Sequence, residues 1–266
     1  MRKIVLIFLF TKIAFAYIDT DLDGVADNDD LCPNTLFTDL VNKNGCPIKT
    51  LSNTSSEHNF NFMIGFAKSE LDQNTFEKTN TTYKTYQINY DYKKYSVYLA
   101  TSTYKSNDEQ GFNDTSLGLN YNFFQKNNLS ISAGLEVIFP TYKSDFKNES
   151  TDYGMNIDIF YNFNNIFLFN RAAYTFINDK DIAFILHQNT ISTNTGLGYL
   201  FNNDLYTSLT YYQSKSIYKD VDNIKSSSLN LNYKINNHYF ISSSYSYGLS
   251  DSTSDNFISF GFGYNF

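Results

Sequence analysis

The sequence of 266 residues contains no tryptophan, three prolines and two cysteines, and it has fewer basic than acidic residues. The formal net charge is −7, so nucleic acid is not an expected partner. Aromatic residues are abundant instead, with 23 tyrosines, 25 phenylalanines and an aromatic share of 18%. Abundant aromatics together with so little proline indicate a strand-rich fold.

The first 16 residues are typical of a secretory signal peptide. Arg2 and Lys3 precede the apolar run 4–10, and an A-x-A cleavage site ends at Ala16, although Lys12 interrupts the pattern. The apolar run is far shorter than the roughly 20 residues of a spanning helix, so a membrane anchor is the weaker interpretation. Removal of three cations would leave the mature chain at −7 − 3 = −10.

An acidic segment follows over residues 17–50. Carboxylates stand at positions 1, 3, 5, 9 and 12 of a loop with glycine at position 6, a spacing that wraps oxygen ligands around one Ca²⁺ ion. Side chains so close together repel one another unless a divalent cation neutralises them. Amphipathic helices do not flank the loop, so an EF-hand is a poor fit, and a solvated acidic linker is the alternative. The carboxylates are Asp19, Asp21, Asp23, Asp27 and Asp30.

The string DxDxDGxxDxxDxCP that begins at Asp19, with NGCP at 44–47, resembles a thrombospondin type 3 repeat. This version is similar to the one in linkers of OmpA-like outer-membrane proteins. The resemblance implies calcium ligation by the five aspartates, with Val25 offering a backbone carbonyl. The chain has one such repeat, whereas the family usually stacks several.

The two cysteines, Cys32 and Cys46, lie in this segment, and each is followed by proline. In an exported protein such a pair is expected to form a disulfide rather than a metal site. The bond would close a loop of about fourteen residues and contribute roughly 3 kcal/mol through loop-closure entropy. We expect it to stiffen a segment that is too small to build a core.

A linker at 51–57 leads to residues 58–266, where apolar and polar residues alternate with period two. Short turns at 93–94, 125–128, 164–165, 202–204 and 236–237 alternate with longer polar connections. Bacterial membrane barrels show the same asymmetry between periplasmic turns and outer loops. About twelve runs are present, beginning near residues 58, 80, 94, 113, 129, 151, 166, 185, 205, 223, 238 and 254.

One face of each predicted strand is apolar, and the other is mostly Ser, Asn, Gly and Thr. A soluble β-sandwich would bury the apolar face and carry ordinary charged residues on the other. Strands in lipid must close into a ring, because an open edge leaves N–H and C=O groups unpaired. The sequence therefore predicts an all-β fold, a closed antiparallel transmembrane barrel of about 12 strands behind a short irregular calcium-binding segment.

The alternating aromatics end on the terminal Phe266, which resembles the assembly signal of bacterial outer-membrane barrels. The resemblance implies a location in the outer membrane of a Gram-negative bacterium, surrounded by lipid, with the acidic segment in the periplasm. It also implies recognition of the last strand by the barrel-assembly machinery.

Two residues of the inner face are expected to form an ion pair. A two-residue turn at 164–165 makes paired residue numbers sum to 329, which places Asp158 opposite Arg171. Such a pair would either select ions or only fix the hairpin register, and we favour the structural role. The charged residues with inward parity are Glu136, Asp158, Arg171 and Lys234.

These features favour a narrow passive pore for small solutes or a structural envelope protein, because twelve strands lie between filled small barrels and wide porins. An adhesion or ligand-binding protein is the alternative, acting through outer loops near 105–113, 141–150 and 214–223. An outer-membrane hydrolase is less expected, since the three histidines are widely separated and define no Ser-His-Asp spacing. We therefore expect no enzyme activity.

Overall fold

The computed structural model describes residues 58–71, 79–106, 109–142, 150–182, 185–201 and 204–266, together with Val25, Asp30, Leu31, Asn44 and Cys46. The chain separates into two units between Ser56 and Glu57. The second unit is a single β-sheet that closes on itself. Within the described residues, no helix has the length and apolar character needed to cross a membrane.

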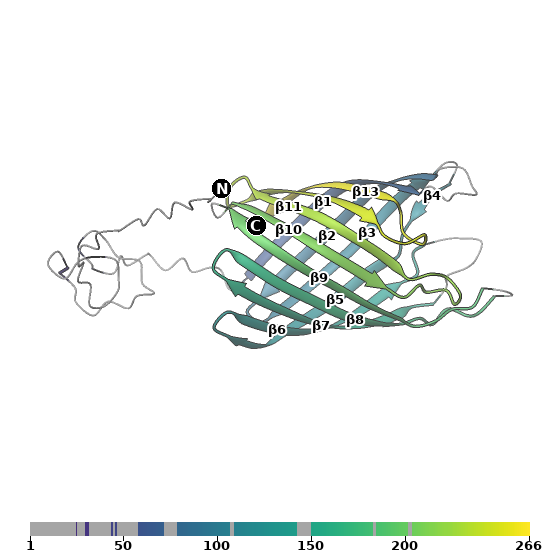
Figure 1. Ribbon diagram of the computed structural model, residues 1–266, viewed down its shortest axis with the longest axis horizontal. Helices are drawn as coiled ribbons and strands as arrows, with labels where there is room; N and C mark the ends of the chain where they lie inside the picture. The colour runs from purple at the N-terminus through teal and green to yellow at the C-terminus, as the bar shows by residue number, and fades with distance from the viewer. Residues whose placement is uncertain are drawn as a thin grey trace, which may run out of the picture. The chain divides into compact units, whose positions relative to one another are not determined.

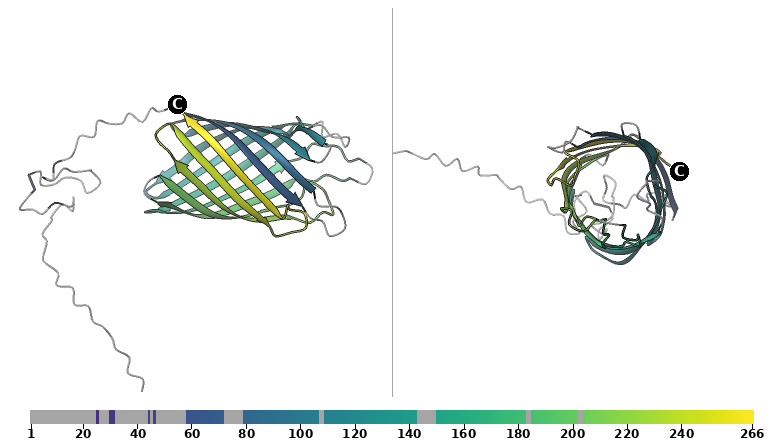
Figure 2. Two further views of the ribbon diagram at one scale, coloured as in Figure 1. Left: turned by 90° about the horizontal axis from the view of Figure 1, so that it is seen from above. Right: turned by 90° about the vertical axis from the view of Figure 1, so that its right-hand side faces the viewer.

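The sheet contains thirteen strands among its described residues, all paired antiparallel (Figure 1). Apart from β4 and β5, strands that follow each other in sequence pair, and β13 pairs with β1, so the ring is closed (Figure 2). In chain order the strands are β1 (His58–Leu71), β2 (Thr79–Tyr92), β3 (Tyr95–Ser106), β4 (Glu109–Phe112), β5 (Thr115–Lys126), β6 (Leu129–Phe139), β7 (Asp152–Phe163), β8 (Ile166–Phe176), β9 (Thr190–Phe201), β10 (Leu205–Ser214), β11 (Ile224–Lys234), β12 (Tyr239–Gly248) and β13 (Asn256–Asn265).

Two of these segments, β4 and β5, belong to one strand of the wall. Both pair with β3, but the paired numbers sum to 215 at Lys105↔Gln110 and to 216 at Tyr95↔Tyr121. A β-bulge at residues 113–114 accounts for this change of register by one residue. The wall therefore has twelve strands, and the prediction of a closed antiparallel barrel of about 12 strands is confirmed.

Short turns join the strands at one end of the barrel, the turn end, and longer connections join them at the other, the loop end. Asn127 and Asn164 lie in two of the turns with φ of 50° and 54°, a left-handed conformation that asparagine adopts more readily than most residues. The four-residue turn expected at 125–128 was wrong, because β5 continues to Lys126. A bulge between Asn122 and Phe124 supplies the extra residue that keeps the outer face continuous.

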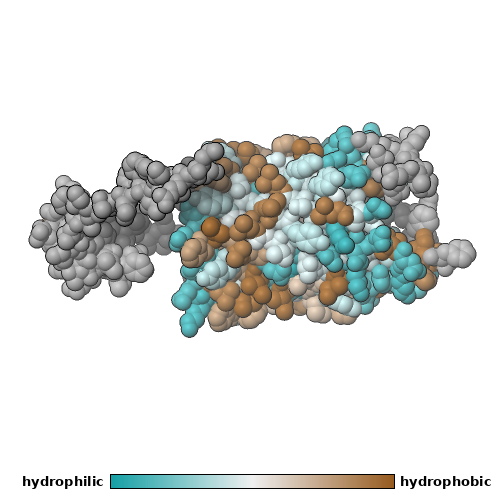
Figure 3. All heavy atoms as spheres, viewed as in Figure 1, coloured by the Kyte–Doolittle hydropathy of each residue, from teal (hydrophilic) through white to brown (hydrophobic). Residues whose placement is uncertain are grey.

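The two faces of the wall differ as the alternation predicts. Large apolar side chains on the outer face remain exposed, for example Leu135 at 65% and Phe260 at 58%. Among the described residues the only buried apolar side chain is Ala67, whereas Ser208 and Thr210 are buried on the inner face. Figure 3 shows apolar residues spread over the outer wall and hydrophilic ones gathered toward the loop end. A water-soluble protein has the reverse arrangement, so this outer surface is matched to hydrocarbon.

Candidate functional site

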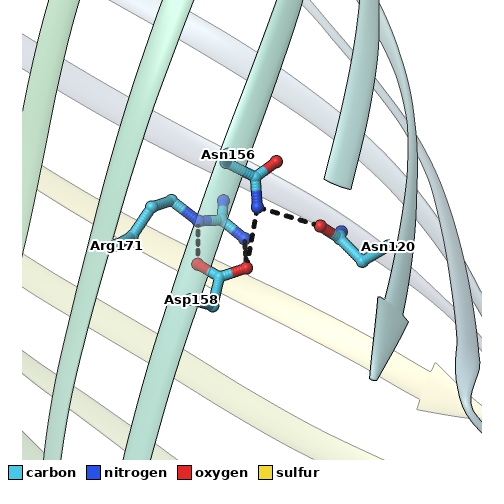
Figure 4. A network of polar contacts seen from close by, with 4 residues as sticks. All are labelled: Asn120, Asn156, Asp158 and Arg171. Atoms are coloured by element: carbon cyan, nitrogen blue, oxygen red, sulfur yellow. Dashed lines mark hydrogen bonds and ion pairs between the residues drawn. The ribbon is translucent and has the colours of Figure 1, made fainter. Parts of the chain in front are cut away.

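The lumen contains an ion pair between Arg171 on β8 and Asp158 on β7. These strands pair in the register fixed by their two-residue turn, so the two residues lie directly opposite each other. Arg171 Nε donates to Asp158 Oδ1 at 2.5 Å, and Nη2 donates to Oδ2 at 3.0 Å (Figure 4). This two-pronged geometry gives the charge pair a fixed orientation on the inner wall.

Two asparagines extend the ion pair along the inner wall. Asn156 Nδ2 donates to Asp158 Oδ2 at 2.8 Å and to Asn120 Oδ1 at 3.0 Å (Figure 4). Asn120 on β5 and Asn156 on β7 both lie opposite Gly134 on the intervening β6. A Cβ at residue 134 would collide with both amides, so glycine leaves the space in which they meet.

A second polar cluster lies on β1, β2 and β3. Asn89 Nδ2 donates to Asn61 Oδ1 at 2.7 Å, and Gln87 Nε2 donates to Asn89 Oδ1 at 2.9 Å. Nearer the turn end, Ser96 Oγ donates to Asp91 Oδ1 at 2.5 Å. The amide and hydroxyl groups of this wall thus form hydrogen bonds with one another, and they face the lumen.

A cavity of about 440 Å³ separates these two walls. Arg171 borders it from β8, and Asn61, Asn89 and Asp91 border it from β1 and β2. In the ring of twelve wall strands β2 and β8 are five places apart, which is close to diametrically opposite. The Arg171 side chain is 48% exposed, against 24% for Asp158, so it faces this cavity. At this level polar side chains from both walls border one cavity.

Glu136 stands on β6, one inward-facing position nearer the loop end than Gly134. It lies opposite Gly118 on β5 and Gly154 on β7, so neither flanking residue presents a side chain beside it. Tyr98 is also opposite Gly118, and its ring covers that glycine. Gly118 therefore leaves space for the tyrosine ring on the strand next to Glu136.

Aromatic rings also face the lumen, where the sequence analysis expected mostly small polar residues. Phe169 lies opposite Gly196, and Phe240 lies opposite Gly263. A Cβ on either glycine would meet the ring, so each ring occupies the space that its glycine leaves on the neighbouring strand. The rings therefore lie along the wall rather than across the passage.

The inner face carries more acid than base. Asp91 was not among the predicted inward charges. Alternation does predict it, because Asp91 stands between the outward-facing Tyr90 and Tyr92. Glu109 and Asp152 were missed because they lie at strand ends, which alternation does not fix. In the described strands five acidic and two basic residues have inward parity: Asp91, Glu109, Glu136, Asp152, Asp158, Arg171 and Lys234.

The predicted calcium segment lies largely outside the described residues, as does the predicted signal peptide. Leu31 N donates to Asn44 O at 2.9 Å, which joins residues close in sequence to the two cysteines. Within the described part of the chain no cluster of three His, Cys, Asp or Glu side chains could hold a metal ion. Of the predicted site residues, Val25, Asp30 and Cys46 are described, and Asp19, Asp21, Asp23, Asp27 and Cys32 are not.

The three histidines lie at the ends of the barrel. His58 stacks on Tyr92 at the turn end, with ring centroids 4.7 Å apart, and His238 stacks on Tyr264 at 5.6 Å. His187 lies at the loop end, with its ring centroid 5.4 Å from that of Tyr218. The structure thus places each histidine against a tyrosine ring.

A closed antiparallel wall that is apolar outside and polar inside defines a class of protein. Apart from the interrupted strand made of β4 and β5, the wall strands have 10 to 14 residues, enough to cross a bilayer when tilted. Every wall strand is paired with a neighbour on each side around the ring, as a hydrocarbon environment requires. The protein is a transmembrane β-barrel of the bacterial outer-membrane type.

No protein-family model and no curated protein matches this chain. Solved structures of similar fold include a KdgM porin, which is 12% identical with a TM-score of 0.48 over 77% of this chain and 99% of its own. A Salmonella typhi OmpF complex with daunomycin is 9% identical, with a TM-score of 0.41 and coverage of 79% and 97%. The translocator domain of the autotransporter NalP from Neisseria meningitidis is 11% identical, with a TM-score of 0.47 and coverage of 81% and 90%.

Proposed function

We propose that this barrel is a narrow passive pore that lets small hydrophilic solutes cross the outer membrane. The supporting observation is the cavity of about 440 Å³ between Arg171 and the opposite wall at Asn89 and Asp91. A lumen closed by packed side chains would hold no such space. Amide and hydroxyl side chains on its walls replace part of the hydration shell of a passing solute.

The charge of the lumen favours cations over anions in this proposal. Five inward acidic residues face two inward basic ones in the described strands, which leaves three negative charges in excess. Fixed charge in a narrow channel with low-dielectric walls concentrates counter-ions. Asp91 and Glu136 are the acids expected to contribute most, because Asp158 is paired with Arg171.

Planar-bilayer recording of the purified mature protein tests the pore. We expect discrete conductance steps and, under a salt gradient, a reversal potential of the sign that cation preference gives. The double variant Asp91→Asn, Glu136→Gln should move that potential toward zero while it leaves the fold intact. Folded protein that stays electrically silent would overturn the pore and leave a structural envelope role.

A calcium-binding leader in the periplasm forms a second part of the proposal. It rests on the spacing of the five aspartates, since most of them lie outside the described residues. The hydrogen bond from Leu31 to Asn44 supports a closed loop between the two cysteines. The leader and the barrel are separate units, so loss of one does not predict loss of the other.

Adhesion or ligand binding through the outer loops is a second candidate function. Leu186 and Ile217 at the loop end are each 38% exposed, and Val221 is 44% exposed. The connections that carry them are tied together, since Lys219 N donates to Leu186 O at 2.8 Å. Replacement of all three apolar residues by serine should abolish attachment of the protein to its partner surface without changing the conductance of the barrel. Attachment that survives the replacement would exclude this candidate.

A further inference from the structure

The loop end of the lumen contains a cavity of about 620 Å³ on the wall formed by β2, β3 and β4, bordered also by residues that precede β5 and follow β6. It lies at the end of the barrel where β4 is labelled in Figure 1. Tyr83, Tyr104 and Tyr142 line it together with Glu109 and Asp114. A solute that enters from the loop end would meet this cavity before it reaches Arg171.

Two of the tyrosines form a fixed aromatic wall. The ring centroids of Tyr104 and Tyr142 are 5.5 Å apart, and their planes are inclined by 42°. Tyr104 lies opposite Gly111, so its ring rests against a strand that presents no side chain there. Tyr142 is held by the carboxylate of Asp114, whose Oδ1 accepts its backbone N–H at 3.0 Å. Both rings are thus in place before any ligand arrives.

The charge around this wall is negative. Glu109 is exposed on the inner side of β4, and no lysine or arginine is among the described residues that line the cavity. A tyrosine is already neutral near pH 7, and burial raises the pKa of Tyr142 further, to about 12. The cavity therefore offers neutral π faces beside carboxylates.

We propose that this cavity is a binding site for small organic cations, with an alkylammonium group held over the rings of Tyr104 and Tyr142 and drawn in by Glu109. Aromatic faces attract cations through the ring quadrupole, and a carboxylate adds charge attraction. A neutral sugar would gain the stacking but not the charge term. The inference rests on the proposed pore, for which it names a solute class.

Tetraethylammonium is a suitable probe, because it has no hydrogen-bond donor and binds through charge and π contact alone. In planar-bilayer recordings of the mature protein, we expect reversible block of the conductance when tetraethylammonium is added on the side that faces the loop end. Tyr104→Leu should raise the half-blocking concentration about fivefold or more, and Glu109→Gln should raise it as well. Tyr104→Phe keeps the ring face and should block like the wild type.

Tyr153→Leu is the matched control, since Tyr153 stands near the loop end of β7 but faces outward and is 51% exposed. It should leave the block unchanged. Block that is equal from both sides, or indifferent to Tyr104→Leu in a conducting barrel, would overturn the site and leave the pore standing. Equal block by glucose at the same concentration would assign the cavity to sugars instead.

Calorimetric titration of the protein in nanodiscs separates the two proposals if the barrel does not conduct. Saturable heat with tetraethylammonium that disappears in Tyr104→Leu would support the site although the pore proposal has failed. Absence of heat in a correctly folded wild-type barrel would overturn the site as well.

Discussion

Arg171 is bound to Asp158 through two hydrogen bonds, yet 48% of its side chain remains exposed to the lumen. An ion pair with that much contact with water contributes about 0–1 kcal/mol to stability. In the proposed pore its charges would still act on ions, because solutes would move through the cavity that Arg171 borders. On that proposal the pair is better placed to tune permeation than to hold the barrel together.

Removal of the cation from this pair should change selectivity more than stability. We predict that Arg171→Met strengthens the cation preference in reversal-potential measurements, because Asp158 loses its counter-charge. The change in unfolding free energy should stay below about 1 kcal/mol. Lys105→Met is the control, since it removes the same charge from the outer face of β3. A reversal potential that moves equally in both variants would contradict the prediction.

Much of the barrel follows from the sequence because alternation and turn length act together. Period two fixes which face each residue occupies, and the two-residue turn at 164–165 fixes which residues oppose each other. Asp158 and Arg171 were placed opposite one another by this arithmetic alone. Their two hydrogen bonds are found at that register.

Other features depend on information that alternation does not carry. The bulges at 113–114 and between Asn122 and Phe124 change the register by one residue, and no residue type at these positions predicts a bulge. The hydrogen bond between Asn120 and Asn156 spans two strand pairs, so an error in either register would hide it. The aromatic rings that lie over glycines can likewise be placed only when the register between neighbouring strands is known.

The meeting of these two asparagines depends on the absence of a side chain at Gly134. We predict that Gly134→Ala separates the amides and destabilises the barrel by about 1–3 kcal/mol, because a Cβ collides with both. Urea unfolding followed by far-UV circular dichroism measures this change. Gly154→Ala should cost less, since its Cβ would meet Glu136 at 3.3 Å. Equal losses in both variants would remove the role assigned to Gly134.

The terminal residue links the first and last strands of the wall. Phe266 N donates to Phe60 O at 2.9 Å, and the two rings lie 4.9 Å apart. We predict that deletion of Phe266 lowers the yield of heat-modifiable barrel in outer-membrane fractions several-fold, because the hydrogen bond and the ring contact with Phe60 would be lost where the first and last strands meet. Phe163→Ala, at a turn-end position that is 58% exposed, is the control and should lower it less. Unchanged yield after the deletion would show that these contacts are not needed to close the barrel.

The acidic leader should bind one calcium ion in the full mature protein. We predict saturable heat in calorimetric titration with Ca²⁺, because five aspartates so close in sequence repel each other without a cation. Asp23→Asn should weaken binding at least tenfold, which is about 1.4 kcal/mol. Asp39→Asn makes the same change of charge outside the ligand spacing and should bind like the wild type.

Reduction of the cysteines gives an independent test of the same segment. If a bond between Cys32 and Cys46 closes the loop, dithiothreitol should weaken calcium binding in the wild type, because the open chain loses more conformational entropy when it wraps the ion. The conductance of the barrel should not change, since the barrel is a separate unit. Calcium affinity that is equal in reduced and oxidised protein would separate ion binding from the disulfide, and heat that is absent in both would leave the segment an acidic spacer.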